Sequence, residues 1–232
     1  MLRVSVTTLE AFRRVSETDW GNEEELIASI KGEEIPKSWQ AVAGTAWHEI
    51  IANSNLTAED EMVDLYGFQF EDDAIFQAEE TIGPGGLWEV KATRTVRIDR
   101  QLVTVVGKCD NLRGDFIQDN KAKFSPLDIG DYEKSLQWRF YLWIFDASEF
   151  RYNFFLFKEP AEEIAGIPRL CLLKNVMTAS FFPYPNLGSD CEIWIHRFIE
   201  WAREKNLISY LKSPGGFSSL EDAGLGDPIR FD

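Results

Sequence analysis

Two aspartates and a lysine mark the stretch of the sequence that is best suited to chemistry. Asp110 ends an apolar segment, and a turn at 113–115 separates it from a second segment that holds Asp119 and Lys121. A hairpin brings Asp110 and Asp119 side by side, where carboxylates repel unless they are protonated or bridged by a cation. Oxygen ligands of this kind suit Mg²⁺. Because side chains alternate along a strand, Lys121 shares a face with Asp119 and could position or deprotonate an attacking water. The group predicts a hydrolytic site, although an ordinary surface hairpin with a solvated Lys121 would show the same residues.

Two predicted helices carry further side chains of this kind. His48 follows Gly44 and other small residues, which would let its helix approach a sheet closely. Its imidazole could bind a metal or contact a phosphate, although a single helical histidine is more often structural. Gln137 and Tyr141 stand four residues apart and so share one helix face, where an amide and a phenol could hold a nucleotide or the lysine.

The elements that must position these residues follow one another as in an α/β protein. An extended start leads into a helix that Thr7 or Thr8 could cap and that runs through Arg14. Helices are then predicted over 39–52, 129–146 and 190–207, strands over 74–82, 88–98, 102–109, 116–120 and 150–157, and an extended segment over 170–182. This order predicts a single α/β domain over 1–212, with a central mixed β-sheet flanked by helices, and a loosely held tail over 213–232.

Composition narrows the class of protein. A chain of 232 residues, 44% of them hydrophobic, can bury the core of one domain and does not resemble a disordered protein. No apolar run reaches the ~18–20 residues of a membrane-spanning helix, and the first residues lack a secretory signal pattern. We therefore expect a cytoplasmic protein without a membrane partner. Cys109, Cys171 and Cys191 are widely spaced, which argues against a disulfide framework.

Charge is distributed unevenly along the chain. The 24 basic and 39 acidic residues give a net charge of −15, which alone looks unfavourable for nucleic-acid binding. Residues 38–90 contain no lysine or arginine, whereas residues 91–123 carry eight basic and four acidic residues, a local charge of +4. The segment that holds the candidate site is therefore the part of the chain that a phosphate backbone could approach, with weak and salt-sensitive affinity.

Taken in order, the motifs resemble the RecB-type branch of the PD-(D/E)XK nuclease superfamily, which includes the RecB nuclease domain and CRISPR-associated adaptation nucleases. They span residues 5 to 141 and read Ser5-x-Thr7-x-Leu9-x-x-Phe12, Gly44-x-x-x-His48, Gly107-x-x-Asp110, Asp119-x-Lys121 and Gln137-x-x-x-Tyr141. Cys109 stands where the superfamily's name places proline, a common variation.

The resemblance implies a restriction-endonuclease-like core and a Mg²⁺- or Mn²⁺-dependent deoxyribonuclease, with exonuclease action in DNA processing, recombination or repair expected before sequence-specific cleavage. It assigns catalytic roles to Asp110, Asp119, Lys121, Gln137 and Tyr141, and metal binding to His48, Asp110, Asp119, the Asn120 carbonyl and, loosely, Glu79. An iron–sulfur cluster is not expected, because four cysteine ligands would be needed. The chain has no helicase signature, so a helicase or a strand-annealing protein is a possible partner alongside DNA.

A second interpretation belongs to a different class of protein. The acidic interval 38–90 would also suit a catalytically inactive nuclease fold that binds a basic partner or mimics DNA. The intact set of Asp110, Asp119 and Lys121 favours the nuclease, because an abandoned site need not keep all three.

Overall fold

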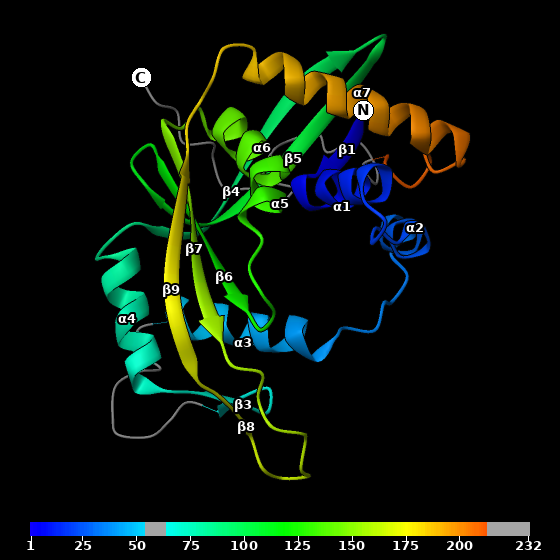
Figure 1. Cartoon of the computed structure of the whole chain (residues 1–232). Helices are drawn as coiled ribbons and strands as arrows, with labels where there is room; N and C mark the ends of the chain where they lie inside the picture. Colours follow the sequence, from blue (N-terminus) through cyan, green and yellow to red (C-terminus); the bar gives the residue numbers. More distant parts are fainter. Residues whose placement is uncertain (54–63, 213–232) are drawn as a thin grey trace.

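A six-stranded mixed sheet forms the centre of the molecule, as the computed structural model of residues 1–53 and 64–212 shows (Figure 1). Its strands run in the order β1 (Leu2–Ser5), β5 (Gln101–Arg113), β6 (Phe116–Lys123), β7 (Glu149–Phe157) and β9 (Leu173–Phe181), and β4 (Leu87–Ile98) pairs with β5. The β1–β5 and β6–β7 pairs are parallel, whereas β4–β5, β5–β6 and β7–β9 are antiparallel. The predicted single α/β domain with a mixed sheet flanked by helices is confirmed.

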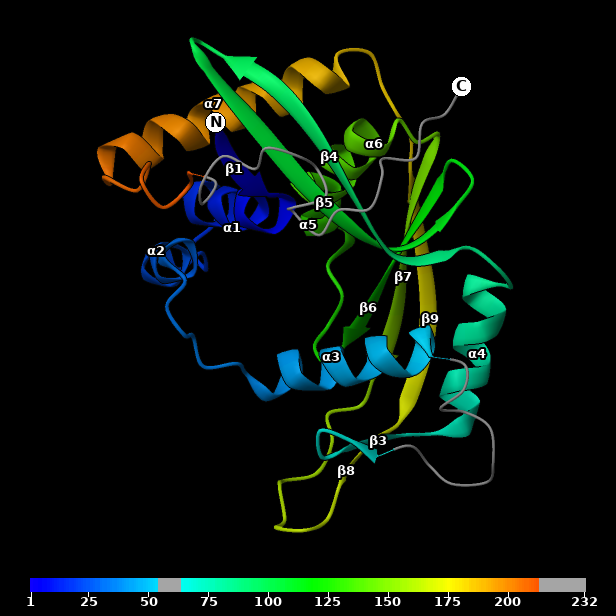
Figure 2. The same ribbon diagram turned by 180° about the vertical axis from the view of Figure 1, so that it is seen from behind.

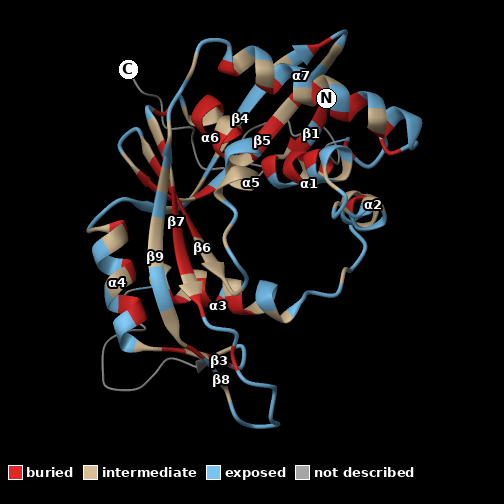
Figure 3. Ribbon diagram, viewed as in Figure 1, coloured by how far each residue is buried: buried red, intermediate tan, exposed pale blue. Residues whose placement is uncertain are grey.

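Helices cover the two faces of this sheet unequally. The larger core joins one face to α1 (Val6–Glu17), α6 (Leu136–Phe145) and α7 (Leu187–Glu204), with α2 (Glu23–Lys31) against α1. On the other face, α3 (Trp39–Ala52) packs on β6, and α4 (Asp72–Ile82) packs on β7 and β9. A small sheet of β2 (Asp64–Leu65), β3 (Phe68–Phe70) and β8 (Arg169–Cys171) closes this second core. Between the two layers, β7 is buried along most of its length (Figure 3).

The sheet forks where β5 leaves β6. Only Asn111–Arg113 pair with Phe116–Gln118, next to the turn. Beyond these pairs β5 continues between β1 and β4, and β6 continues beside β7. Asp110 on β5 and Asp119 on β6 adjoin the last pair, Asn111 and Gln118, at the point where the two strands separate. The fork therefore places both carboxylates where it opens.

The helix predicted over 129–146 is two helices, α5 (Ile129–Lys134) and α6, which separate at Ser135. The Ser135 hydroxyl accepts a hydrogen bond from the Gln137 amide, and Glu10 of α1 accepts one of 2.7 Å from the Leu136 amide. These side chains satisfy amides that a continuous helix would bond internally, so a new helix begins here.

The strand predicted over 74–82 is wrong, because this segment is α4. Its buried residues Ala74, Ile75, Ala78 and Ile82 recur at helical spacing, and Gly83 ends the helix with a positive φ of 73°. The cap predicted at Thr7 or Thr8 is also wrong: the Ser5 side chain accepts a hydrogen bond from the Thr8 amide, so Ser5 caps α1.

The extended segment predicted over 170–182 divides between two sheets. β8 pairs with β3 in the small sheet, whereas β9 pairs with β7 in the large one. The last helix begins at Leu187 and ends at Glu204. The tail predicted over 213–232 lies outside the described residues.

The sequence also predicts that the cysteines form no disulfide framework and that no helix spans a membrane. Cys109, Cys171 and Cys191 are each buried and free. Across the described part of the chain, no helix combines the length and the hydropathy that crossing a bilayer requires.

Candidate active site

Asp110 is fixed in place by the opposite strand of the fork. Its Oδ2 atom accepts a hydrogen bond of 2.7 Å from the backbone amide of Asn120. This carboxylate therefore takes the role that a backbone carbonyl would have if β5 and β6 stayed paired. The bond holds the Asp110 side chain against β6, one residue from Asp119.

Asp119 is almost completely buried, with 1% of the residue exposed. Its Oδ1 atom accepts hydrogen bonds from Gln137 Nε2 at 2.5 Å and from Lys121 Nζ at 3.0 Å. The Oδ2 atom makes close ionic contact with Lys121 but has no partner in hydrogen-bonding geometry. Burial raises the pKa of Asp119 and the nearby Asp110 charge raises it further, while Lys121 opposes both effects. The site thus holds a carboxylate with one underused oxygen.

Lys121 points to the same side of β6 as Asp119, as strand alternation predicts. Burial alone would lower the pKa of Lys121, but the carboxylates of Asp119 and Asp110 outweigh burial and raise it. The ammonium also lies 5.8 Å from the centre of the Tyr152 ring. An ammonium in this ion pair is a fixed positive charge at the mouth of the fork.

His48 reaches the fork from α3. Its Nδ1 atom lies 3.3 Å from Asp110 Oδ2. Burial lowers the pKa of His48, which the Asp110 charge and the Asn120 backbone only partly oppose. A neutral imidazole keeps a lone pair, which a metal ion or a hydrogen-bond donor can use.

Gly44 does not have the packing role that the sequence predicts for the small residues of α3. Ala43, Ala46 and Trp47 are buried against the second core, whereas a Cβ at Gly44 would meet no atom within 4 Å. Gly44 is therefore not required for the helix to approach the sheet. It lines the space in front of His48 instead.

That space is an open groove of about 1010 Å³ between α3 and strands β4, β5 and β6. Both cations along its walls, Lys108 and Lys121, come from the sheet. The groove is lined by Thr7, Gln40, Ala41, Gly44, Thr45, His48, Glu49, Ala52, Asn53, Trp88, Glu89, Lys108, Lys121 and Ala122. Its position gives a substrate access to Lys121 and His48 at the fork.

Tyr141 lies one step behind the carboxylates. It is buried, and its hydroxyl donates a hydrogen bond of 2.6 Å to the Lys108 carbonyl. A Cβ at Gly107 would come within 3.1 Å of the Tyr141 ring, so the glycine permits this close approach. Gln137 therefore contacts Asp119 directly, whereas Tyr141 holds the backbone of β5 just before Asp110.

Asn120 and Glu79, which the resemblance placed in the metal site, differ in position. The Asn120 side chain is buried, and its Oδ1 atom accepts a hydrogen bond of 2.9 Å from Asn153, which leaves its backbone as the part that faces Asp110 and His48. Glu79 lies on the exposed side of α4 rather than on a strand, and it lines a different hollow, together with Gly83 and Pro84. The fold does not bring Glu79 into the groove.

Glu10 is a residue of the site region that sequence reasoning missed. Its carboxylate is buried, ion-paired with Arg13 at 2.8 Å, and hydrogen-bonded to the Ser135 hydroxyl at 3.1 Å as well as to the Leu136 amide. Glu10 thereby anchors the start of α6, directly before Gln137. The partners lie 125 and 126 residues away in sequence, so no local pattern could reveal them.

The donors at the fork fit a hard divalent cation in chemistry. Two carboxylates, one with an underused buried oxygen, stand beside a neutral imidazole and the Asn120 backbone. Over residues 1–53 and 64–212, no three His, Cys, Asp or Glu side chains converge closely enough to form a ligand cage. This arrangement suits Mg²⁺, which is commonly held by one or two carboxylates and keeps several waters, better than it suits a structural zinc ion.

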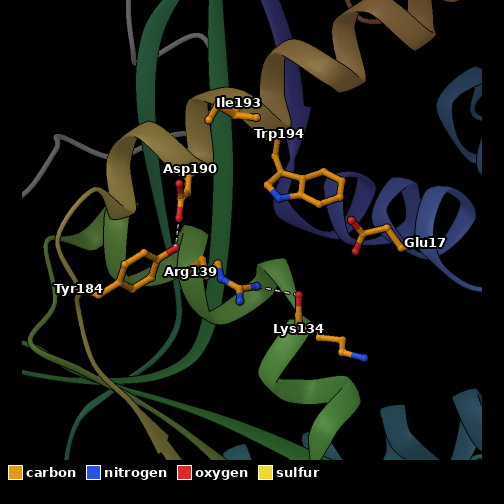
Figure 4. A pocket seen from close by; sticks show the side chains of 7 residues that line it. All are labelled: Glu17, Lys134, Arg139, Tyr184, Asp190, Ile193 and Trp194. Carbon is orange, nitrogen blue, oxygen red and sulfur yellow. Dashed lines mark hydrogen bonds between the residues drawn. The ribbon is translucent and has the colours of Figure 1, made fainter.

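A second hollow, of about 450 Å³, lies between α6, α7 and the end of α1 (Figure 4). Several of its polar groups already have partners: Arg139 donates to the carbonyls of Lys134 and Ser135, and Tyr184 donates to Asp190 at 2.7 Å. The Arg139 bonds join α6 to the end of α5, and the Tyr184 bond holds the segment before α7 against that helix. The hollow therefore has a structural explanation.

Comparisons with known proteins do not identify a family. No protein-family model matches the chain, and no curated protein matches it significantly in sequence. The solved structure of SSO0001 aligns with a TM-score of 0.47 and 14% identity, covering 93% of this chain and 79% of that chain. A phage-related exonuclease from Haemophilus somnus 129PT aligns with a TM-score of 0.32 and 16% identity, covering 75% of this chain and 93% of that chain. The geometry of the fork therefore remains the basis for a function.

Proposed function

We propose that the chain is a Mg²⁺- or Mn²⁺-dependent nuclease with a restriction-endonuclease-like core that hydrolyses phosphodiester bonds in DNA. The observation that carries this proposal is the buried Asp119 carboxylate, held by Lys121 and Gln137 at the fork beside Asp110. A buried acid is expensive to keep unless a cation or a function compensates for it. Lys121, which pairs with this acid, is one of the two lysines that line the groove.

Asp110 and Asp119 would hold the cation, with His48 and the Asn120 carbonyl as further donors. When bound, the cation supplies Lewis-acid chemistry at a phosphoryl oxygen. Gln137 keeps the Asp119 carboxylate in one orientation through its hydrogen bond to Oδ1. The Asn120 amide does the same for Asp110.

Lys121 acts on the substrate as a positive charge. Its ion pair with Asp119 holds the ammonium at the groove, where it neutralises charge that develops on the phosphate and helps to place the attacking water. His48, whose imidazole is neutral, lies beside Asp110 at the same fork. Tyr141 supports the backbone that carries Asp110.

Exonuclease action is the form of the activity that we propose, in DNA processing, recombination or repair. The test compares linear duplex DNA with covalently closed circular DNA, each in Mg²⁺, in Mn²⁺ and with excess EDTA. Loss of the linear substrate with release of mononucleotides, and survival of the circle, is expected. Cleavage of the circle would correct the proposal to an endonuclease, and no cleavage in either metal would favour the acidic binding protein.

A further inference from the structure

Over one half of the second sheet face, the described part of the chain places no helix. The helices α3 and α4 cover β6, β7 and β9, whereas the corresponding side of β1, β4 and β5 has no described helix across it (Figure 2). Residues of β5 alternate between buried positions such as Val103 and Val105 and more exposed ones such as Thr104 and Val106. The more exposed set therefore forms an open surface that begins at Asp110 and continues away from the fork.

Basic side chains outnumber acidic ones on this uncovered face. Strand register places Lys91 opposite Lys108, Arg97 opposite Leu102, and Arg3 opposite Thr104. All four basic residues are exposed. Among the described residues, this face holds two acidic side chains, Glu89 on β4 and Asp110 on β5. The face is thus positive in a chain whose net charge is −15.

Lys91 and Lys108 stand directly opposite each other on β4 and β5, and their like charges repel. Like charges directly opposite each other on antiparallel strands destabilise a sheet. Lys108 makes an ion pair with Glu89, whereas Lys91 forms no ion pair with the described residues. Glu89 adopts a positive φ of 58° within β4, an unusual conformation for a residue with a side chain. An anion lying over the two lysines would relieve this repulsion.

The uncovered face and the groove form a continuous surface. Lys108 and Glu89 line the groove, and Lys108 stands two residues before Asp110 on β5. From Asp110 to Leu102 the strand extends for roughly 27 Å at about 3.4 Å per residue. That length matches roughly eight base pairs of duplex, since each strand carries one phosphate per ~3.4 Å of helix axis.

We propose that the uncovered face of β1, β4 and β5 binds the phosphate backbone of duplex DNA next to the bond that is cleaved, with Arg3, Lys91 and Arg97 as contacts beyond the groove. The inference rests on the proposed function for the identity of the groove. Charge complementarity selects DNA as the occupant, because an acidic duplex supplies phosphates along the length of this strip. None of these three side chains belongs to the catalytic group.

The test is the salt dependence of binding, measured without cleavage. Fluorescence anisotropy of a labelled 20-base-pair duplex would be recorded with the full chain in EDTA over a range of salt concentrations. The variant Arg3→Glu/Lys91→Glu/Arg97→Glu is compared with Lys158→Glu/Lys174→Glu, which reverses two exposed charges after β7 and on β9. Circular dichroism confirms that both variants are folded.

The inference predicts that the triple variant binds at least about tenfold more weakly at low salt and that its slope of log affinity against log salt falls by about 2 to 3, because each lost phosphate contact removes about 0.9. The control variant should bind within about twofold of the parent. Equal binding by the triple variant and the parent would overturn the inference and leave the face to an acidic protein partner. If the chain binds DNA through this face but cleaves none in either metal, the proposed nuclease function is refuted and the proposed binding surface stands.

Discussion

The backbone amide of Asn120 donates a hydrogen bond of 2.7 Å to the Asp110 carboxylate across the fork between β5 and β6. An amide at this position would otherwise lose its strand partner, because the regular pairing of the two strands ends at Asn111 and Gln118. The Asp110 side chain therefore gives this amide a hydrogen-bond partner and also places a carboxylate in the candidate site. Structure and proposed chemistry share the same bond.

This double role predicts a split between two substitutions at Asp110. Asp110→Asn keeps an oxygen that can accept from the Asn120 amide, so its free energy of unfolding should stay close to that of the parent. Asp110→Ala leaves the amide without a partner and should lose about 1–3 kcal/mol. Urea denaturation followed by circular dichroism measures both values. Equal stability of the two variants would show that the hydrogen bond contributes nothing.

Substitution of Gln137 should lower the rate of DNA cleavage more than it lowers the stability of the fold. Its amide donates to the buried Asp119 Oδ1, and hydrogen bonds to charged groups contribute about 1.5–3 kcal/mol. If that orientation matters in the transition state, Gln137→Ala should cleave DNA about tenfold to a hundredfold more slowly. Gln101→Ala, at the β4–β5 turn, is the matched control. A parent-like rate for Gln137→Ala would remove this residue from the account.

Two glycines near the site should respond in opposite directions to alanine. A Cβ at Gly44 would enter open space within α3, so Gly44→Ala should stabilise the protein by up to about 1 kcal/mol through helix propensity. A Cβ at Gly107 would press on the Tyr141 ring, and Gly107→Ala should cost about 1–3 kcal/mol. Thermal unfolding of both variants measures the difference. Destabilisation by Gly44→Ala would restore the close-packing role that the sequence predicts.

Metal binding should appear in stability before any substrate is added. A cation that binds only the folded protein stabilises it by about 2.7 kcal/mol at a concentration a hundred times its Kd. Titration with Mg²⁺ should therefore raise the melting temperature of the parent and leave that of Asp110→Asn unchanged, and EDTA should reverse the rise. An equal rise in both proteins would place the bound cation elsewhere.

The sequence allowed the central features of the site to be predicted because they are local. Asp110, Asp119 and Lys121 lie within one hairpin, where alternation and a short turn determine their neighbours. The small sheet could not be predicted in this way, since Phe68 pairs with Arg169 about a hundred residues later through strands of three residues. Mixed apolar and polar residues made α4 read as a strand, although Ala74, Ala78 and Ile82 follow helical spacing.

Long-range contacts also explain why the end of α5 and the role of Glu10 were missed. The segment 129–146 contains no proline, and its one glycine is near the start, so its sequence offers no strong reason to break. The break at Ser135 depends on a carboxylate from α1 that caps α6. Tertiary hydrogen bonding thus set the position of Gln137, whereas the Q-x-x-x-Y spacing only predicted that Gln137 and Tyr141 share a face.

The most direct test of the central claim is the cleavage rate of Asp119→Asn on linear duplex DNA in saturating Mg²⁺. The control is Asp115→Asn, an exposed acid in the turn between β5 and β6. We predict that Asp119→Asn remains folded and loses at least about a hundredfold in rate, the order of loss when one group that stabilises transition-state charge is removed. Asp115→Asn should cleave like the parent. A folded Asp119→Asn protein that cleaves DNA at the parent rate would contradict the account.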